Sequence, residues 1–285
     1  MADRPPGRLL VVGTPIGNLE DLAPRAARAL AEADAIFCED TRVTAKISSR
    51  FALRAPRISC PAPRERARVP ELLRRLRAGE TVALVTDAGM PAFSDPGRDL
   101  VAAAVAAGFP VLVVPGPSAV ASALAVSGLP AAPHTFLGFL PARSGERRRF
   151  LEAHRDRRET LVWFEAPHRL VESLGEAARI LGPRRAAVAR ELTKLHEETL
   201  RGTLDELARV FGARGAGRGE ITVVVQGAEG ADTAPSLGEG EVDTAIQEAL
   251  ATGLSKRSAA REIAARSGRP ARQIYARMVE MERES

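Results

Sequence analysis

Short apolar runs alternate with amphipathic stretches along the first half of the chain. In the stretch 69–78, Leu72, Leu73 and Leu76 fall on one helical face, and Gly79 ends the helix. Strands that alternate with helices in this way predict an α/β fold with a largely parallel sheet. We expect strands at 8–13, 35–38, 81–86 and 111–114, and helices at 22–33, 69–78, 95–107 and 118–127.

The same alternation resumes after a break at Gly128, Leu129 and Pro130. It predicts a second α/β unit, with a mixed sheet. We expect strands at 136–139, 160–164, 186–189, 198–201 and 220–226, and helices at 167–181 and 204–211.

From Gly227 onward the sequence becomes rich in Gly, Ala, Pro, Ser and acidic residues, which is typical of a linker. Beyond it the apolar spacing, with Gly268 at a turn, is typical of a helix–turn–helix. A nucleic-acid-binding module and a plain helical cap both remain open for this tail. We expect its three helices at 242–251, 255–267 and 270–282. The domains are therefore predicted as an N-terminal α/β domain at 1–122, a C-terminal α/β domain at 123–228, a linker at 229–240 and a helical tail at 241–285.

Composition excludes several classes of protein. A chain of 285 residues, 45% of them hydrophobic, is long enough for two globular domains and too apolar for disorder throughout. Its two cysteines, Cys38 and Cys60, form no C-x-x-C pair, so we expect neither a disulfide framework nor a metal site. The first apolar run is too short for a signal peptide, which predicts a cytoplasmic protein. The uncharged stretch 100–133 is broken by prolines and glycines, so no membrane span is expected.

The net charge of +5 is unevenly distributed. Residues 50–79 hold nine arginines against Glu65 and Glu71, and residues 256–277 hold seven basic residues against Glu262 alone. Basic runs of this kind favour a polyanion such as nucleic acid as the partner. Solvated helix faces in an arginine-rich chain are the alternative.

Polar, glycine-rich loops follow four strands of the first half. Ligands of open α/β sheets bind beyond the carboxyl ends of the strands. The loop 13–19 reads GTPIGNL, and its glycines let the backbone approach a ligand closely. It is not the G-x-G-x-x-G of a dinucleotide site, and no Gly-Lys pair exists for a P-loop. With the loops 39–42, 86–97 and 114–119, it predicts a cleft for a cofactor or substrate.

Together, the loop sequences resemble one known family. Between Leu9 and Gln226 they read, in order, GTPIGNL, EDTR, DAGMPAFSDPG, VPGPSA, FEAPHRL, RELTKLHEE and GEITVVV. They are similar to the ribosomal RNA small subunit methyltransferase I family of the tetrapyrrole-methylase superfamily. The resemblance implies two α/β domains of tetrapyrrole-methylase type with the cofactor cleft between them, plus a small C-terminal helical extension. It also implies a homodimer that uses S-adenosylmethionine (SAM) to methylate the ribose 2′-oxygen of a decoding-centre cytidine in 16S rRNA of the small ribosomal subunit.

The resemblance further implies which residues form the site, and it implies no metal ion. Carried onto this sequence, the residues expected to bind SAM are Val12, Asp87, Met90, Ser118, Ala119, Phe164, Ala189 and Ile221. Methyl transfer to a ribose hydroxyl needs alignment and a proton acceptor. Our hypothesis is that six residues line the ribose: Glu39, Asp40, Arg42, Glu165, His168 and Arg190. Which of them is the general base stays open.

Two other functions are compatible with these motifs. One is methylation of a tetrapyrrole or of a protein side chain by an enzyme of the same superfamily. The other is a non-enzymatic nucleic-acid-binding protein whose α/β body senses a ligand. The motifs EDTR, SDPG and PHRL resemble the ribosomal branch, and a basic tail has no use with a small macrocycle. These observations favour RNA as the substrate.

Overall fold

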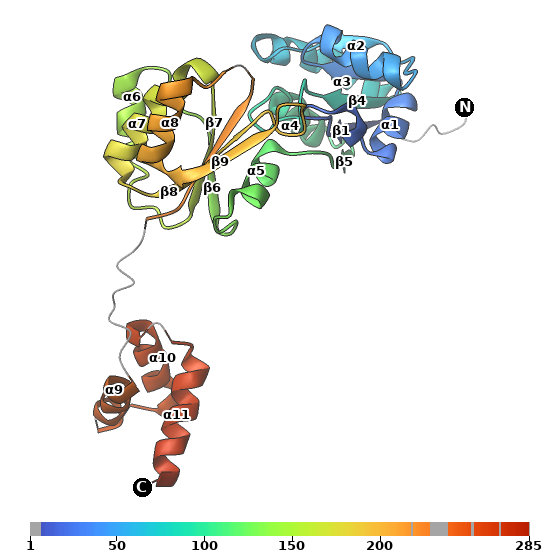
Figure 1. Ribbon diagram of the computed structural model, residues 1–285. Coiled ribbons are helices and arrows are strands. Elements are labelled where there is room, and N and C mark those ends of the chain that lie inside the picture. Colours follow the sequence, from blue (N-terminus) through green and yellow to red (C-terminus); the bar gives the residue numbers. More distant parts are fainter. Residues whose placement is uncertain (1–6, 218, 229–238, 252–253, 268, 285) are drawn as a thin grey trace. The chain divides into compact units, whose positions relative to one another are not determined.

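The computed structural model describes residues 7–217, 219–228, 239–251, 254–267 and 269–284. The chain divides into two compact units, Met1–Gly227 and Ala228–Ser285. The first unit contains two five-stranded sheets with helices against them (Figure 1). Of the predicted linker at 229–240, all but the last two residues lie outside the described residues.

The first sheet is parallel throughout, with the strand order β3-β2-β4-β1-β5. Successive side chains of a strand enter different cores: Leu10 and Val12 pack with α1 and α2, and Leu9 packs with α3 and α4. Burial on both faces is typical of parallel sheets. The strands are β1 (Arg8–Val12), β2 (Ala35–Cys38), β3 (Arg57–Ser59), β4 (Thr81–Val85) and β5 (Val111–Val114). The helices are α1 (Pro24–Ala31), α2 (Thr41–Arg50), α3 (Glu65–Arg77), α4 (Arg98–Ala106) and α5 (Ala119–Ser127), with 3-10 turns η1 (Leu19–Asp21) and η2 (Ala62–Arg64).

The second sheet is mixed, as predicted, with the order β6-β7-β10-β8-β9 and one parallel pair, β6 with β7. Helices of the second half cover one face of it. Helix α5, which follows the first sheet, covers the other face through Val120, Ala123 and Leu124. Ile16, in the loop after β1, packs into this same core and so connects the first half to the second sheet. The strands are β6 (His134–Phe139), β7 (Thr160–Glu165), β8 (Arg185–Arg190), β9 (Glu198–Thr203) and β10 (Ile221–Val225). The helices are α6 (Ser144–Glu152), η3 (Pro167–Arg169), α7 (Leu170–Leu181) and α8 (Leu204–Arg214).

The second unit consists of α9 (Glu239–Ala251), α10 (Lys256–Ser267) and α11 (Ala271–Glu284). It has a hydrophobic core of its own, which includes Ile246, Ile263, Ile274 and Met278. The three predicted helices are therefore present, and the predicted turn residue Gly268 lies outside the described residues. No described helix is both long and apolar enough to cross a membrane.

Candidate active site

Loops of the first half meet at the carboxyl edge of its sheet. Thr14, after β1, exchanges two backbone hydrogen bonds with Gly89, after β4, at N···O distances of 2.9 and 3.1 Å. The Thr14 hydroxyl also donates to the carbonyl oxygen of Thr86 at 3.1 Å. Gly13 lies so close to Gly116, after β5, that a Cβ on Gly13 would be 2.6 Å from Gly116 Cα. Only glycine permits this backbone contact, which ties the loops into one rim.

Carboxylates lie in a row along this rim. Glu39 Oε2 accepts a hydrogen bond from Thr86 Oγ1 at 3.0 Å, and Asp87 Oδ1 accepts one from the Asp40 backbone N–H at 3.1 Å. Burial raises the pKa of the Asp87 carboxyl, and the negative charge of Glu39 acts in the same direction. Glu39 and Asp87 are therefore close enough that ionisation of one carboxyl raises the pKa of the other.

Asp40 and Arg42 make a helix cap and an exposed ion pair. Asp40 Oδ1 accepts the Arg42 backbone N–H at 2.8 Å, which makes Asp40 the N-cap of α2. Arg42 Nη2 lies 2.6 Å from Asp40 Oδ2, and the hydrogen bond from this side chain lowers the pKa of Asp40 to about 2. So low a pKa makes Asp40 a weak proton acceptor. Of Glu39, Asp40 and Arg42, only Glu39 therefore adds its carboxylate to the acidic group on the rim.

Asp95 belongs to the same row, although we predicted it as the start of a helix. That helix begins three residues later, at Arg98. Burial raises the pKa of the Asp95 carboxyl to about 6, with a contribution from the charge of Glu39. The segment is strained, because Ala92 and Ser94 have φ angles of 64° and 66°. A strained segment that holds a partly buried acid with a raised pKa is typical of a functional site. The signal in the sequence was a second carboxylate in a long, proline-bounded loop.

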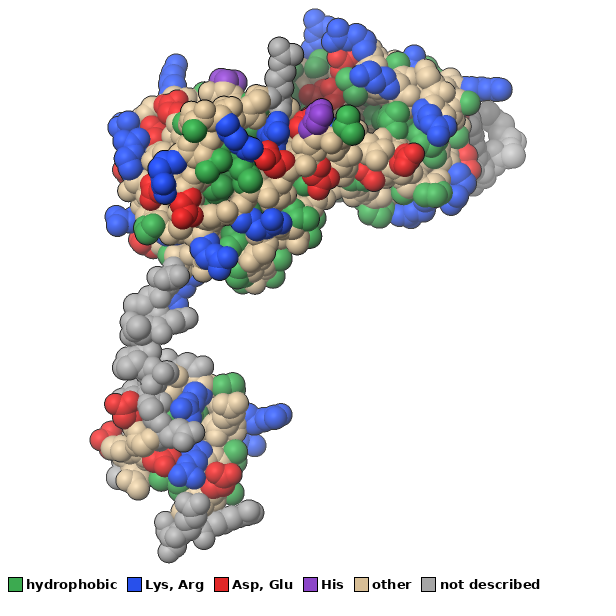
Figure 2. Space-filling view, viewed as in Figure 1, with side chains coloured by type: hydrophobic (Ala, Val, Ile, Leu, Met, Phe, Trp, Pro, Cys, Tyr) green, Lys and Arg blue, Asp and Glu red, His purple; other side chains and the backbone are tan. Residues whose placement is uncertain are grey.

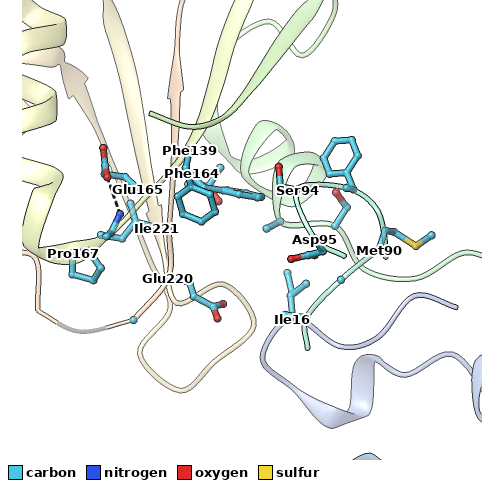
Figure 3. Close-up of a pocket in the computed structure, with 18 residues that line it drawn as sticks. Ile16, Met90, Ser94, Asp95, Phe139, Phe164, Glu165, Pro167, Glu220 and Ile221 are labelled. Carbon is cyan, nitrogen blue, oxygen red and sulfur yellow. Dashed lines mark hydrogen bonds between the residues drawn. The ribbon is translucent and has the colours of Figure 1, made fainter. Parts of the chain in front are cut away.

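A cavity of about 350 Å³ opens beside Asp95 (Figure 3). Residues from both halves of the unit line it, and Figure 3 shows the Asp95 carboxylate directed toward the space between Ile16 and Glu220. An aromatic cluster forms another wall, where the ring centroids of Phe139 and Phe164 are 5.4 Å apart. The cavity thus joins an acidic side to an aromatic side.

Five of the eight residues expected to bind the cofactor line this cavity: Met90, Ser118, Ala119, Phe164 and Ile221. Val12 and Ala189 are instead buried in the hydrophobic cores. Asp87 precedes the lining residue Ala88 and holds its carboxylate against the Asp40 backbone. Contact of these three with a cofactor stays a prediction.

The three candidates from the second half have partners or positions of their own. Glu165 lines the cavity, but its buried carboxylate lies 2.8 Å from Arg169 Nη2, and Figure 3 shows it directed away from the aromatic rings. His168 is exposed on η3 and lines a neighbouring hollow rather than this cavity. Arg190 Nη2 lies 3.3 Å from Glu198 Oε2. Of the six residues of our hypothesis, Glu165 is the one that lines the cavity, and a role of the six at the ribose stays a prediction.

The composition of the cavity favours a ligand with a cationic centre and a flat, apolar part. The carboxylate of Asp95 suits the first and the ring of Phe164 suits the second. Ser118 Oγ accepts the Ala121 backbone N–H and caps α5, whose N-terminus suits a carboxylate. Within the described residues, no group of three or more His, Cys, Asp or Glu side chains is arranged to hold a metal ion.

Comparison with known proteins identifies the family. Residues 8–208 match the family described as Tetrapyrrole (Corrin/Porphyrin) Methylases. The chain belongs to the tetrapyrrole methylase family. A relative of this methylase from Mycobacterium tuberculosis, named ribosomal RNA small subunit methyltransferase I, is 44% identical over 283 residues, which is 98% of this chain and 97% of that protein. A relative of the same name from Thermotoga maritima is 44% identical over 223 residues, 78% of this chain and 100% of that protein.

Solved structures confirm the fold of this methylase. Diphthine synthase matches with a TM-score of 0.61 at 16% identity, over 78% of this chain and 90% of that chain. Uroporphyrin-III C-methyl transferase from Thermus thermophilus, complexed with S-adenyl homocysteine, matches with a TM-score of 0.53 at 22% identity, over 76% of this chain and 96% of that chain. The methylase is a SAM-dependent methyltransferase, as predicted. The acid, the aromatic wall and the capped helix N-terminus fit a sulfonium amino acid joined to adenosine.

Proposed function

We propose that this methyltransferase transfers a methyl group from SAM to the 2′-hydroxyl of a decoding-centre cytidine in 16S rRNA, within the small ribosomal subunit of the cytoplasm. The observation that carries the proposal is the near full-length similarity to ribosomal RNA small subunit methyltransferase I proteins. The cytidine and its 2′-oxygen come from the resemblance of the EDTR, SDPG and PHRL motifs. The 2′-hydroxyl is also what distinguishes RNA from DNA.

The residues that would hold SAM are the five that line the cavity, with Ser118 and Ala119 at the start of α5. When bound, SAM supplies a methyl group on a positively charged sulfur atom. Loops tied together at Thr14 and Gly89 give its binding site a fixed shape. A fixed shape aligns the reacting groups at little entropic cost.

A ribose hydroxyl is a poor nucleophile until its proton is removed. Asp95, Glu165 and Glu220 are the carboxylates that line the cavity, and Glu165 is paired with Arg169 and Glu220 with Lys194, which leaves Asp95 as the acceptor that we propose. With a pKa of about 6, its carboxyl is ionised at neutral pH and yet more basic than a solvated carboxylate. Burial is the main cause of that raised pKa, the charge of Glu39 adds to it, and the hydrogen bond of Thr86 opposes it. Asp95 therefore replaces the six earlier candidates as the proposed general base.

The RNA would lie against exposed arginines of α2 and α3. Figure 2 shows Lys and Arg side chains gathered over the α2 end of the first half. Some arginines of the segment 50–79 are paired with acids, such as Arg66 with Asp99 and Arg75 with Glu80. Others, including Arg74 and Arg77, are exposed and make no ion pair among the described residues. Such side chains suit phosphate contacts, which position RNA without reading its sequence.

A homodimer is part of the proposal. Val105 of α4 and Leu112 and Val113 of β5 are 60%, 47% and 58% exposed, at the edge of the first sheet. Three large apolar side chains near one sheet edge are typical of a surface that another chain covers. We infer that a second copy of this chain covers it.

The test is methyl transfer from labelled SAM to small ribosomal subunits that lack the modification, with naked 16S rRNA and a porphyrinogen as parallel acceptors. We expect label on a ribose of one cytidine of the subunit. Label on the porphyrinogen alone would show that the substrate is a tetrapyrrole and not RNA. SAM binding without transfer to any acceptor would favour a ligand sensor.

A further inference from the structure

Four of the nine phenylalanines of the chain gather at the cofactor cavity. Phe93, in the loop after β4, stacks on Phe136 of β6, with ring centroids 4.9 Å apart and an angle of 12° between the ring planes. Phe164 of β7 contacts the rings of both Phe136 and Phe139, at centroid distances of 4.9 and 5.4 Å. Aromatic residues make up only 4% of the chain, so their concentration here indicates a place for flat ligand groups.

Exposure divides this cluster into inner and outer rings. Phe136 and Phe164 are partly buried and pack against the core between α5 and the second sheet. Phe93 and Phe139 are exposed, yet both line the cavity. SAM inside the cavity would meet the inner ring of Phe164, and a second ligand that arrives from solvent would meet the outer rings. Covering those rings removes apolar surface from water, which favours binding.

A bulge in β6 directs Phe139 toward the cavity. Phe136 pairs with Val162 and Phe139 pairs with Phe164, so three steps along β6 match two steps along β7. Side chains of a regular strand alternate between its faces, and the extra residue therefore places Phe139 on the same face as Phe136. The bulge includes Gly138, whose φ of 68° favours glycine. A regular strand would direct Phe139 to the opposite face of the sheet.

The loop that carries Phe93 is held against this bulge. Ala92 and Ser94, the neighbours of Phe93, are the strained residues described above, and strain of this kind persists where surrounding contacts fix the backbone. A Cβ on Gly138 would lie 3.7 Å from Ser94 Oγ, so the loop and the bulge are in contact. The two outer rings are thus positioned by backbone features from both halves of the unit.

The outer rings lie close to the proposed general base. Asp95 is two residues from Phe93, and Figure 3 shows the Phe139 ring on the side of the cavity that faces Ser94 and Asp95. A nucleotide whose ribose reaches Asp95 carries its base on the same ribose, within reach of these rings. Proteins hold bases of single-stranded RNA by stacking them on aromatic side chains. We propose that the base of the acceptor nucleotide leaves the RNA stack and lies on Phe93 and Phe139 at the mouth of the cavity. This inference rests on the proposed function, and it makes the two phenylalanines substrate-binding residues.

The test compares full-length variants in methyl transfer to unmodified small subunits. We expect F139A and F93A each to lower kcat/KM for the subunit about tenfold, the loss of one stacking contact, and to keep the Kd for SAM within about twofold of the wild type. F139L retains an apolar side chain without a ring and should be as impaired as F139A. F139Y retains the ring and should stay within about twofold of the wild-type kcat/KM. V210A is the matched control, because Val210 of α8 is exposed and does not line the cavity.

The outcomes separate the two proposals. If the wild type methylates the subunit and both F139A and F93A keep its kcat/KM, the rings do not hold the acceptor and the inference fails. A wild-type kcat/KM in F139L would overturn it as well, because apolar bulk would then suffice without a stacked base. A loss of SAM affinity that matches the loss of kcat/KM would show that the rings hold the cofactor instead. If the wild type methylates no RNA, the proposed function fails first, and the inference with it. Thermal unfolding identifies any variant that does not fold, and F139L and F139Y, which keep most of the side-chain volume, then carry the test.

Discussion

The Asp95 carboxyl shows how one residue links stability to the proposed chemistry. Its pKa rises from an ordinary 3.8 to about 6 in the fold, chiefly because the group is buried. A carboxyl group whose pKa is raised by folding stabilises the folded state when it is protonated. This contribution is fully present below pH 3.8 and is lost as the pH rises through about 6. At neutral pH the ionised Asp95 therefore destabilises the protein. That is the protonation state in which it would accept a proton.

Substitution of Asp95 by Asn separates these two roles. We expect D95N to raise the Tm at about pH 8, with a gain that vanishes near pH 3.8, because Asn carries no charge to bury. The same variant loses about 10²- to 10⁴-fold in kcat, the typical contribution of a general base. In the wild type, kcat/KM falls as the pH drops below about 6. Unfolding scans and methyl-transfer rates across pH measure both effects.

Asp99 supplies the matched control for this prediction. It lies on α4, and its exposed ion pair with Arg66 lowers its pKa. D99N should keep the wild-type kcat and should not gain stability at alkaline pH. A wild-type kcat in D95N would remove Asp95 from the mechanism.

At the scale of elements, two guanidinium groups fix the connection from β6 to α6. Arg147 Nη1 donates to the Ala142 carbonyl oxygen at 3.2 Å, and Arg169 Nη2 donates to that of Leu140 at 2.7 Å. Arg147 is buried and pairs with the buried Glu176 at 2.5 Å. Since β6 carries part of the aromatic wall, this network sets one side of the cavity.

Two glutamates that pair with Arg147 differ in burial and test this network. The Glu176 side chain is 2% exposed and that of Glu172 is 61% exposed. We expect E176Q to lower the free energy of unfolding by about 3 kcal/mol, because it breaks a buried ion pair. E172Q should cost less than about 1 kcal/mol, as exposed pairs do. Equal losses in chemical denaturation would show that burial does not set the strength of these pairs.

The sequence predicted the elements whose apolar pattern is strong and missed those whose pattern is weak. All the strands of the second sheet and the parallel core of the first were expected. The strand β3 has one apolar residue, Ile58, and α2 buries Thr44 and Ser48 beside Ile47, so neither shows a clear period. Helix α6 was hidden by its arginines, although Arg147 among them is buried.

The site was predictable only in part, for a related reason. Motifs located the loops, and five of the expected cofactor residues line the cavity. They did not show that Glu165 turns to Arg169, or that Asp95 leaves the helix and enters the carboxylate row. Side-chain direction and burial depend on packing between distant segments, which a local pattern does not contain.

At the scale of the whole molecule, the exposed edge of the first sheet predicts the oligomeric state. Replacing Val113 by Lys places a charge on the apolar patch that a second copy would cover. We expect V113K to shift the protein from dimer to monomer in sedimentation or light scattering, because an unpaired charge at an apolar interface is costly. V210K, at an exposed valine of α8, should leave the dimer intact. A monomeric wild type would refute the dimer.

The two compact units predict which functions separate on truncation. Their hydrophobic cores share no residues among those described, and the relative from Thermotoga maritima is matched in full by 223 aligned residues. A chain that ends at Gly227 should bind SAM with the affinity of the full-length protein, and its main unfolding transition should occur at the same temperature. Its KM for the subunit should rise, because the basic residues of 256–277 are lost. Calorimetry and subunit titrations measure the two effects, and a truncated chain that fails to fold would contradict the division.

The packing of α5 bears on how product leaves the enzyme. Val120 and Leu124 of α5 form a core with the second sheet, and Ile16 of the loop after β1 packs into it, so swinging the first sheet away would expose apolar surface to water. A cofactor that binds and leaves without breaking this core would do so past the side chains that line the cavity. Among them, Phe93 and Phe139 are 46% and 59% exposed, so they can yield to a passing ligand without exposing the core.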